Sequence, residues 1–195
     1  MRRKEALPEG VVDLAIDVQD GKLRVRGSVQ SDELTRRMTR MLQLDVDTSE
    51  FAELARNSER HAWVARSGFG RLLCGTTVWE DAVKIIATTN TTWAQTVRMV
   101  GLLVEKCGRD GAFPTPADVL RFSADELQLD CRLGYRAKSM HALATGIVDG
   151  SIDLAALGDR SLPTPTLFRN YQTLPGIGPY GAAHLLAMDG RHDFI

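Results

Sequence analysis

The sequence lacks any long apolar run, contains little cysteine, and carries no excess of charge of either sign. Every extended hydrophobic stretch is interrupted by Arg, Lys, Asp or Glu, which excludes a membrane-spanning helix of ordinary length. The basic N-terminus is followed by no apolar stretch of the signal-peptide type, so we expect a cytoplasmic protein with no membrane partner. A formal net charge of −1 excludes a strong overall positive field and leaves only local basic patches to attract an acidic partner.

The cysteines do not form a metal-binding pattern. Cys74, Cys107 and Cys131 are too widely spaced for the paired-cysteine knuckles that hold zinc. Three thiols in a cytosolic chain are read most simply as reduced side chains, and two of them lie within apolar segments, where cysteine acts as a small hydrophobic residue. We therefore expect no metal and no cofactor.

The chain of 195 residues is 44% hydrophobic, enough for one large domain or two small ones. Between residues 12 and 18, and again between residues 22 and 26, apolar residues alternate with charged or small ones. Asp20-Gly21, a favoured turn pair, separates the two runs. The pattern predicts a β-hairpin within residues 11–29.

From residue 31 onward, apolar residues recur at helical spacing, and about ten helices are expected. Trp79 and Trp93 lie on apolar helix faces and are predicted to be in the core. Strands followed by many helices indicate an α+β fold that is mostly α, with residues 1–30 as the β-hairpin part of an N-terminal domain and residues 31–195 as a helical domain. The predicted helix starts are Ser31 or Asp32, Thr48, Thr77, Thr115 with Pro116 in the first turn, Ser151 and Thr164.

The most informative segment is a short turn between the last two predicted helices. It reads Leu174-Pro175-Gly176-Ile177-Gly178 and is followed by Pro179, which suits a first helical turn. Glycine is used where the backbone needs positive φ or approaches another group closely. The free amides of such a turn, together with the next helix N-terminus, form an anion site. A helix–helix turn with no ligand is the alternative interpretation.

The complete string matches the helix-hairpin-helix motif, and two further segments match in the same order. Residues 77–93 look like the helix-break-helix segment of the helix-hairpin-helix glycosylases, and Arg132–Lys138 contains their Gly-Tyr-Arg-Ala sequence. From about residue 72 to residue 195 the chain resembles the HhH-GPD DNA glycosylase superfamily, in the branch of 3-methyladenine DNA glycosylase II and 8-oxoguanine glycosylase. The resemblance implies base-excision repair, in which a damaged base is turned out of duplex DNA and cut from its sugar.

The resemblance implies roles for residues of the turns. Leu174, Gly176, Ile177 and Gly178 form the hairpin whose amides hold one DNA phosphate without reading sequence. Asn90 stands where the family places an Asn or Gln in the gap left by the extruded base, a task that suits a group able both to donate and to accept. A helix cap or an Asx turn is an equally good local interpretation of Asn90.

A second set of candidates lies in the Gly-Tyr-Arg-Ala segment and just after the hairpin. Arg132, Arg136 and Lys138 are candidate phosphate contacts, with solvated surface as the alternative. Tyr135 is expected to pack rather than to stack on a base. Tyr180 stands where bifunctional members carry a nucleophilic Lys, and a phenol cannot form an imine with the sugar. We therefore expect a monofunctional activity, with Tyr180 lining the base pocket or, alternatively, packing in the core.

The family's catalytic Asp follows the hairpin by about twenty residues and stabilises the oxocarbenium-like sugar. Counted from Gly178, that position falls about three residues after Ile195. Asp189 and Asp193 are closer to the hairpin than the pattern allows, and Asp193 is only a weak alternative. We expect the chain to be truncated before this residue and inactive, whether through an incomplete gene or as a natural fragment.

Three hypotheses about function follow. The first is a monomeric, monofunctional glycosylase that hydrolyses the N-glycosidic bond of alkylated bases such as 3-methyladenine in double-stranded DNA, and associates with the nucleoid through its DNA. The second is a catalytically incomplete helix-hairpin-helix module that binds DNA without sequence preference. The third is a helical scaffold with a fortuitous Leu-Pro-Gly-Ile-Gly turn, which three ordered matches disfavour.

Overall fold

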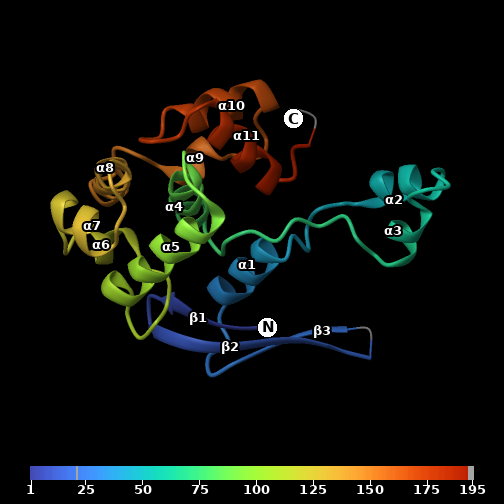
Figure 1. The fold of residues 1–195 in the computed structure, drawn as a ribbon. Helices are drawn as coiled ribbons and strands as arrows, with labels where there is room; N and C mark the ends of the chain where they lie inside the picture. The colour runs from blue at the N-terminus through green and yellow to red at the C-terminus, as the bar shows by residue number, and fades with distance from the viewer. Residues whose placement is uncertain (21, 193–195) are drawn as a thin grey trace.

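The fold of the chain is α+β and mostly α, as predicted. A computed structural model describes residues 1–20 and 22–192. In this part of the chain a three-stranded antiparallel sheet precedes eleven helices. The sheet lies below the first helix, and the helices from residue 78 onward form a body above and beside it (Figure 1). No described helix is long and apolar enough to cross a membrane.

The sheet is a meander of β1 (Arg2–Leu7), β2 (Gly10–Gln19) and β3 (Lys22–Gly27). The β2–β3 hairpin is the predicted one, and its register pairs Gln19 with Lys22 on either side of the turn. Strand β1 was not predicted, because its residues 2–5 are all charged. Its polar residues nevertheless serve the interior, since Glu5 is only 3% exposed and is held there by arginines.

Helix α1 (Asp32–Met41) covers one face of the sheet. Ser31 caps it by accepting a hydrogen bond from the Leu34 amide at 3.2 Å, which selects Ser31 from the two predicted caps. The division of the chain at residue 30 stays a prediction, although α1 belongs to the same apolar cluster as the sheet. That cluster comprises Leu7, Val12, Leu14, Ile16, Leu34, Met38 and Met41.

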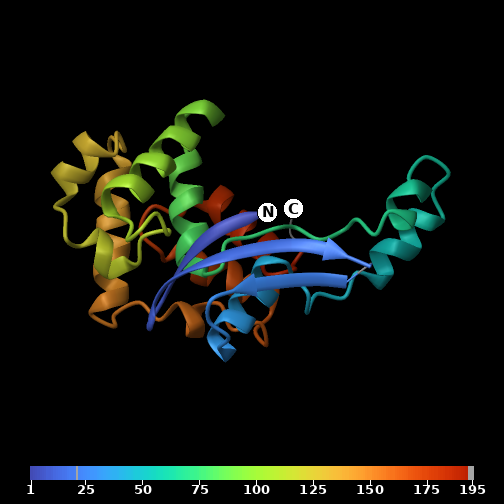
Figure 2. The same ribbon diagram turned by 90° about the horizontal axis from the view of Figure 1, so that it is seen from below.

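Two short helices, α2 (Ser49–Arg56) and α3 (Ala62–Arg66), stand away from the rest of the molecule in both views (Figures 1 and 2). We call residues 47–70 the arm. Ala55 is the one buried residue of these two helices. At the base of the arm the Arg71 guanidinium donates to the carbonyl oxygens of Gln43 and Val46, each at 2.5 Å.

Most helices of the helical body begin at residues whose side chains cap them. Thr77, Thr92, Thr115 and Ser123 each accept a hydrogen bond from an amide of the helix that they precede. One predicted start is wrong: Asp153, not Ser151, caps the short helix that follows, because its carboxylate accepts two amides. The helices are α4 (Val78–Thr88), α5 (Trp93–Cys107), α6 (Pro116–Val119), α7 (Ala124–Asp130), α8 (Arg136–Val148), α9 (Leu154–Leu157), α10 (Thr164–Gln172) and α11 (Pro179–Met188).

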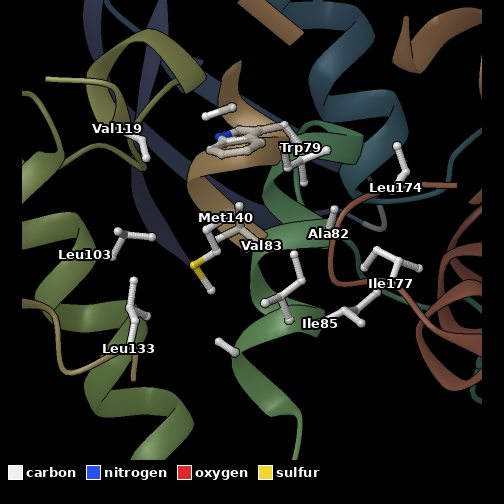
Figure 3. Packing of buried hydrophobic residues seen from close by; sticks show 14 of the residues in the cluster. Trp79, Ala82, Val83, Ile85, Leu103, Val119, Leu133, Met140, Leu174 and Ile177 are labelled. Carbon is white, nitrogen blue, oxygen red and sulfur yellow. The ribbon is translucent and has the colours of Figure 1, made fainter. Parts of the chain in front are cut away.

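The main core surrounds α4, whose apolar side chains meet those of α5, α8 and the turn before α11 (Figure 3). Trp79 is buried as predicted, and its indole N–H donates to the Pro114 carbonyl at 2.8 Å. The prediction for Trp93 is wrong, because this side chain is 76% exposed. Helix α5 turns Met99 and Leu103 into the core, so its other apolar face, which begins at Trp93, remains uncovered.

Buried charges join the sheet to the helical body. The Glu80 carboxylate accepts from Arg3 at 3.1 Å and from Lys84 at 2.5 Å, and Arg3 also pairs with Glu5 at 2.7 Å. Burial raises the pKa of Glu80, but the positive charges of Arg3 and Lys84 outweigh it and lower the pKa from 4.5 to about 2. A carboxylate from α4 is thus held ionised between β1 and its own helix.

Glu80 makes the stability of the fold depend on pH at the acid end. Because its pKa is lower in the folded than in the unfolded chain, its contribution is complete above pH 4.5 and is lost as the pH falls towards 2. We expect Glu80→Gln to cost about 3 kcal/mol at pH 7, since it leaves Arg3 buried without this partner. Urea unfolding measured at several pH values checks this. The difference in stability between wild type and variant should shrink between pH 4.5 and pH 2, and a constant difference would contradict the assignment.

Candidate DNA interface and adjoining cleft

The turn between α10 and α11 is anchored by its apolar side chains. Leu174 and Ile177 are 2% and 5% exposed, and the Ile177 amide donates to the Leu174 carbonyl at 3.0 Å. These two predicted site residues therefore hold the turn in the core. Gly178 is the N-cap residue of α11, and Pro179 occupies the first turn of that helix as predicted.

The two glycines of the turn differ in backbone conformation and in surroundings. Gly176 has a φ of +81°, and a Cβ there would lie 2.7 Å from Ser139 Cβ and 3.3 Å from Ile86 Cδ1. A side chain at this position would therefore push the turn away from α8 and α4. Gly178 has an ordinary negative φ, and a Cβ there would meet nothing within 4 Å. The space beside Gly178 is open to a ligand.

The backbone of this turn offers several unused donors. Within the part of the chain that the structure describes, the amides of Gly176, Gly178, Tyr180 and Gly181 donate to no acceptor. Three of them lie at the start of α11, where the helix dipole adds partial positive charge. The arrangement is the donor set of an anion site at a helix N-terminus.

A second exposed turn, residues 89–92, connects α4 to α5. Asn90 lies at its tip with a φ of +46°, a conformation that Asn tolerates better than most residues. Its side chain is exposed, and Nδ2 donates to the Tyr135 hydroxyl at 3.2 Å. The Tyr135 hydroxyl also lies 3.3 Å from Thr89 Oγ1. These hydrogen bonds to Thr89 and Asn90 lower the pKa of Tyr135.

The Gly-Tyr-Arg-Ala segment supports this turn from the side. The expectation that Tyr135 packs is wrong, because its ring is 59% exposed and stacks against the Arg136 guanidinium, 4.7 Å from the ring centroid. Arg136 has different surroundings from those expected of a phosphate ligand. It is only 8% exposed and donates to the carbonyl oxygens of Thr89, Asn90 and Leu133. Arg136 therefore fixes the turn that carries Asn90.

The other two basic candidates remain at the surface. Arg132 and Lys138 are both exposed, and neither forms an ion pair with another described residue. Arg132 has a φ of +56° and immediately precedes the segment that supports Asn90. Their positions are compatible with phosphate contacts, which stay a prediction.

A cleft of about 740 Å³ opens beside these turns, between α4, α5 and α11. Tyr180 lines it and is 59% exposed, and its ring lies 4.1 Å from the His184 ring, centroid to centroid, at a tilt of 40°. His184 Nδ1 lies 2.9 Å from the Tyr180 carbonyl oxygen, a distance at which a protonated Nδ1 donates a hydrogen bond to that oxygen. The remaining lining residues are Lys84, Ile85, Thr88, Trp93, Thr96, Val97, Val100, Gly101, Val104 and Met188.

Sequence reasoning placed Tyr180 in a pocket but missed His184 and Trp93. His184 could have been found from its spacing, because residues four apart share a helix face and Tyr180 had already been chosen. Trp93 could not, because apolar periodicity does not show which faces of a helix its neighbours cover. Lys84 was also missed, and its amine is paired with Glu80 and lies 5.6 Å from the centroid of the Phe113 ring.

No carboxylate among the described residues lines this cleft. Asp189 is 8% exposed at the end of α11, accepts a hydrogen bond from the Tyr171 hydroxyl, and lies 4.0 Å from Arg40 and 3.9 Å from Arg160. Burial is the largest influence on Asp189 and raises the pKa of its carboxyl. Asp189 thus serves as an internal anchor, and Asp193 lies outside the described residues. The described residues contain no cluster of side chains that could hold a metal ion.

The sheet, the helical body and the turn before α11 together form a fold that is similar to that of solved DNA glycosylases. The chain aligns over 96% of its length with the 3-methyladenine DNA-glycosylase of Archaeoglobus fulgidus, at a TM-score of 0.77 and 20% identity. It aligns over 99% of its length with the 8-oxoguanine glycosylase/lyase of Clostridium acetobutylicum, solved with DNA containing cytosine opposite 8-oxoG, at a TM-score of 0.73 and 18% identity.

The chain covers 67% of the Archaeoglobus protein and 71% of the Clostridium protein. No protein-family model matches the sequence, and no curated protein sequence matches it. The likeness therefore confirms the predicted fold, whereas the activity of this chain has to be argued from its site.

Proposed function

We propose that this chain binds duplex DNA and turns a damaged base out of the stack, as a DNA glycosylase of base-excision repair does. The observation that carries the proposal is the meeting of three features at the C-terminal end of α4. Gly176 of the hairpin packs against Ile86, the Asn90 turn follows Thr89, and the aromatic cleft is lined by Thr88. A phosphate site, a gap-filling side chain and a receiving pocket are the parts that base extrusion requires.

The hairpin supplies the phosphate contact. Its free amides and the start of α11 favour an anion, and the open space beside Gly178 allows a DNA backbone to approach. Contacts of this kind fix the position of the protein on DNA without reading sequence. Arg132 and Lys138 add exposed positive charge around the start of α8, which is consistent with binding that weakens as salt rises.

Asn90 is the residue that we assign to the vacated position in the duplex. Its exposed amide can donate to and accept from the orphaned base, and its backbone is held by Arg136. The Tyr135 hydroxyl orients the amide before DNA arrives. This preorganisation reduces the conformational entropy that binding would otherwise cost.

The cleft is the site that we assign to the extruded base. Tyr180, His184 and Trp93 offer aromatic faces on which a flat heterocycle can stack, and the walls are otherwise mainly apolar. Stacking of this kind favours electron-poor rings, so we propose alkylated purines such as 3-methyladenine as the class of damage recognised.

We propose that the chemistry is monofunctional hydrolysis, because the position of the lyase amine is taken by Tyr180. Hydrolysis of a glycosidic bond uses a carboxylate beside the sugar, and no described residue supplies one to the cleft. The same observation favours the second candidate, a module that binds and distorts DNA without releasing a base. A base-release assay distinguishes the two candidates, because release of a free base supports hydrolysis and DNA binding without release supports the module.

Gly178→Asp separates DNA binding from folding. Asp is a favourable N-cap residue, so the substitution should leave the free energy of unfolding unchanged or raise it by up to about 1 kcal/mol. The same carboxylate would repel a phosphate, so affinity for a duplex, measured by fluorescence anisotropy at low salt, should fall at least about 10-fold. Gln128→Asp on exposed α7 makes the same charge change away from the hairpin and should bind like wild type. Equal affinity of all three proteins, or a flat salt response, would reject the phosphate site.

Asn90→Ala tests base extrusion. A duplex that carries 2-aminopurine opposite an abasic site brightens when the base unstacks, and wild type should increase this signal. We expect Asn90→Ala to lose most of the increase while affinity falls by less than about 10-fold, because the phosphate contacts remain. Tyr135→Phe, which removes only the hydroxyl that orients Asn90, should lie between the two. An unchanged signal in Asn90→Ala would place the gap-filling group elsewhere.

Tyr180→Lys tests the absence of lyase chemistry. Wild type should form no covalent complex with abasic-site DNA in the presence of borohydride, because no amine stands at the hairpin position. The Lys variant should form one, and adding Lys84→Gln should not remove it. If wild type is trapped and Lys84→Gln abolishes the trapping, Lys84 is the nucleophile and the monofunctional assignment is incorrect.

A further inference from the structure

The third strand of the sheet has an uncovered edge. In the order β1-β2-β3, β3 pairs only with β2. Within the described part of the chain, no β3 residue makes a backbone hydrogen bond outside that ladder. All six residues of β3 are exposed. Edge strands with free donors and acceptors are templates for pairing with another strand.

A groove continues the apolar face of the sheet past this edge. Val25 pairs with Ile16 in the ladder, so it shares a face with a residue of the sheet core, yet it is 37% exposed. Leu23 lies on the same face and is 40% exposed. A cavity of about 500 Å³ separates them from α1, where Leu34 and Met38 form the facing wall. Helix α1 thus leaves the β3 end of this apolar face uncovered.

The opposite face of β3 is basic. Lys22, Arg24 and Arg26 alternate with the apolar residues along the strand. Arg26 pairs with Asp17, and Arg24 lies 3.9 Å from Asp20. Lys22 has no ion-pair partner among the described residues, so this face keeps an excess of positive charge at the free edge.

We propose that the β3 edge takes a strand from a partner protein whose sequence alternates apolar with acidic residues. Its backbone would extend the sheet, its apolar side chains would fill the groove against α1, and its carboxylates would lie beside the basic row. Strand addition of this kind draws affinity from backbone hydrogen bonds and specificity from alternate side chains. A second copy of this chain is a poor occupant, because pairing of two β3 strands would bring their basic rows together.

The test uses the whole chain and two labelled nine-residue peptides, one alternating Val with Glu and the other Val with Lys. Fluorescence anisotropy should show the Glu peptide binding at least about 10-fold more tightly than the Lys peptide. Lys22→Glu combined with Arg24→Glu should reverse this preference. Arg56→Glu combined with Arg60→Glu, on the exposed surface of the arm, makes the same charge change and should leave the preference intact.

Leu23→Glu should abolish binding of the Glu peptide by placing a charge in the groove, and an unaltered melting temperature would show that the fold is retained. Failure of both peptides to bind, or equal binding of both, overturns the proposal. A concentration-dependent dimer in analytical ultracentrifugation that Leu23→Glu dissociates also overturns it, in favour of a second copy. Loss of duplex DNA affinity in the Lys22/Arg24 variant without peptide binding would assign the basic row to DNA. None of these outcomes depends on the glycosylase proposal, because the turn between α10 and α11 is unchanged in every variant.

Discussion

The close approach of Gly176 to α8 and α4 is the contact on which the candidate site depends. With no Cβ at this residue, the turn settles against Ser139 and Ile86 and adopts the positive φ that it needs. Helix α8 also carries Arg136, which holds the turn containing Asn90. The first turn of α8 therefore supports two loops that are distant in sequence, the Gly176 turn and the Asn90 turn. Functional groups on loops gain their precision from this kind of rigid support.

Much of this arrangement could be predicted from the sequence because it is encoded locally. A two-residue turn between alternating strands, a Thr before an amphipathic helix, and Gly-x-Gly before Pro each act within a few residues. Strand β1, the exposure of Trp93 and the burial of Arg136 depend on which distant segments meet. Arg136 shows the difficulty clearly: an Arg beside a Tyr looks like surface, and only tertiary structure reveals the carbonyl oxygens of Thr89 and Asn90 as its acceptors.

The junction between sheet and helical body relies on charge as well as on apolar packing. Glu80 and Asp81 are adjacent on α4, and they pair with Arg3 of β1 and Arg40 of α1, respectively. Buried ion pairs contribute modestly to stability but are costly to break singly, so they specify orientation more than they add free energy. These pairs lie where the two apolar clusters meet, and there the ionic contacts offset the free-energy cost of removing the charges from water.

The arm contributes little to the stability of the rest of the molecule. Its helices bury almost no side chains. Arg71, which follows the arm, donates hydrogen bonds to Gln43 and Val46, which precede it. Leu54, Trp63 and Phe69 remain more than half exposed there. Opening of the arm exposes little new apolar surface, so its free energy is small and separate from that of global unfolding. Amide exchange in the arm should thus report on this segment alone, while the hairpin and its supporting helices stay closed.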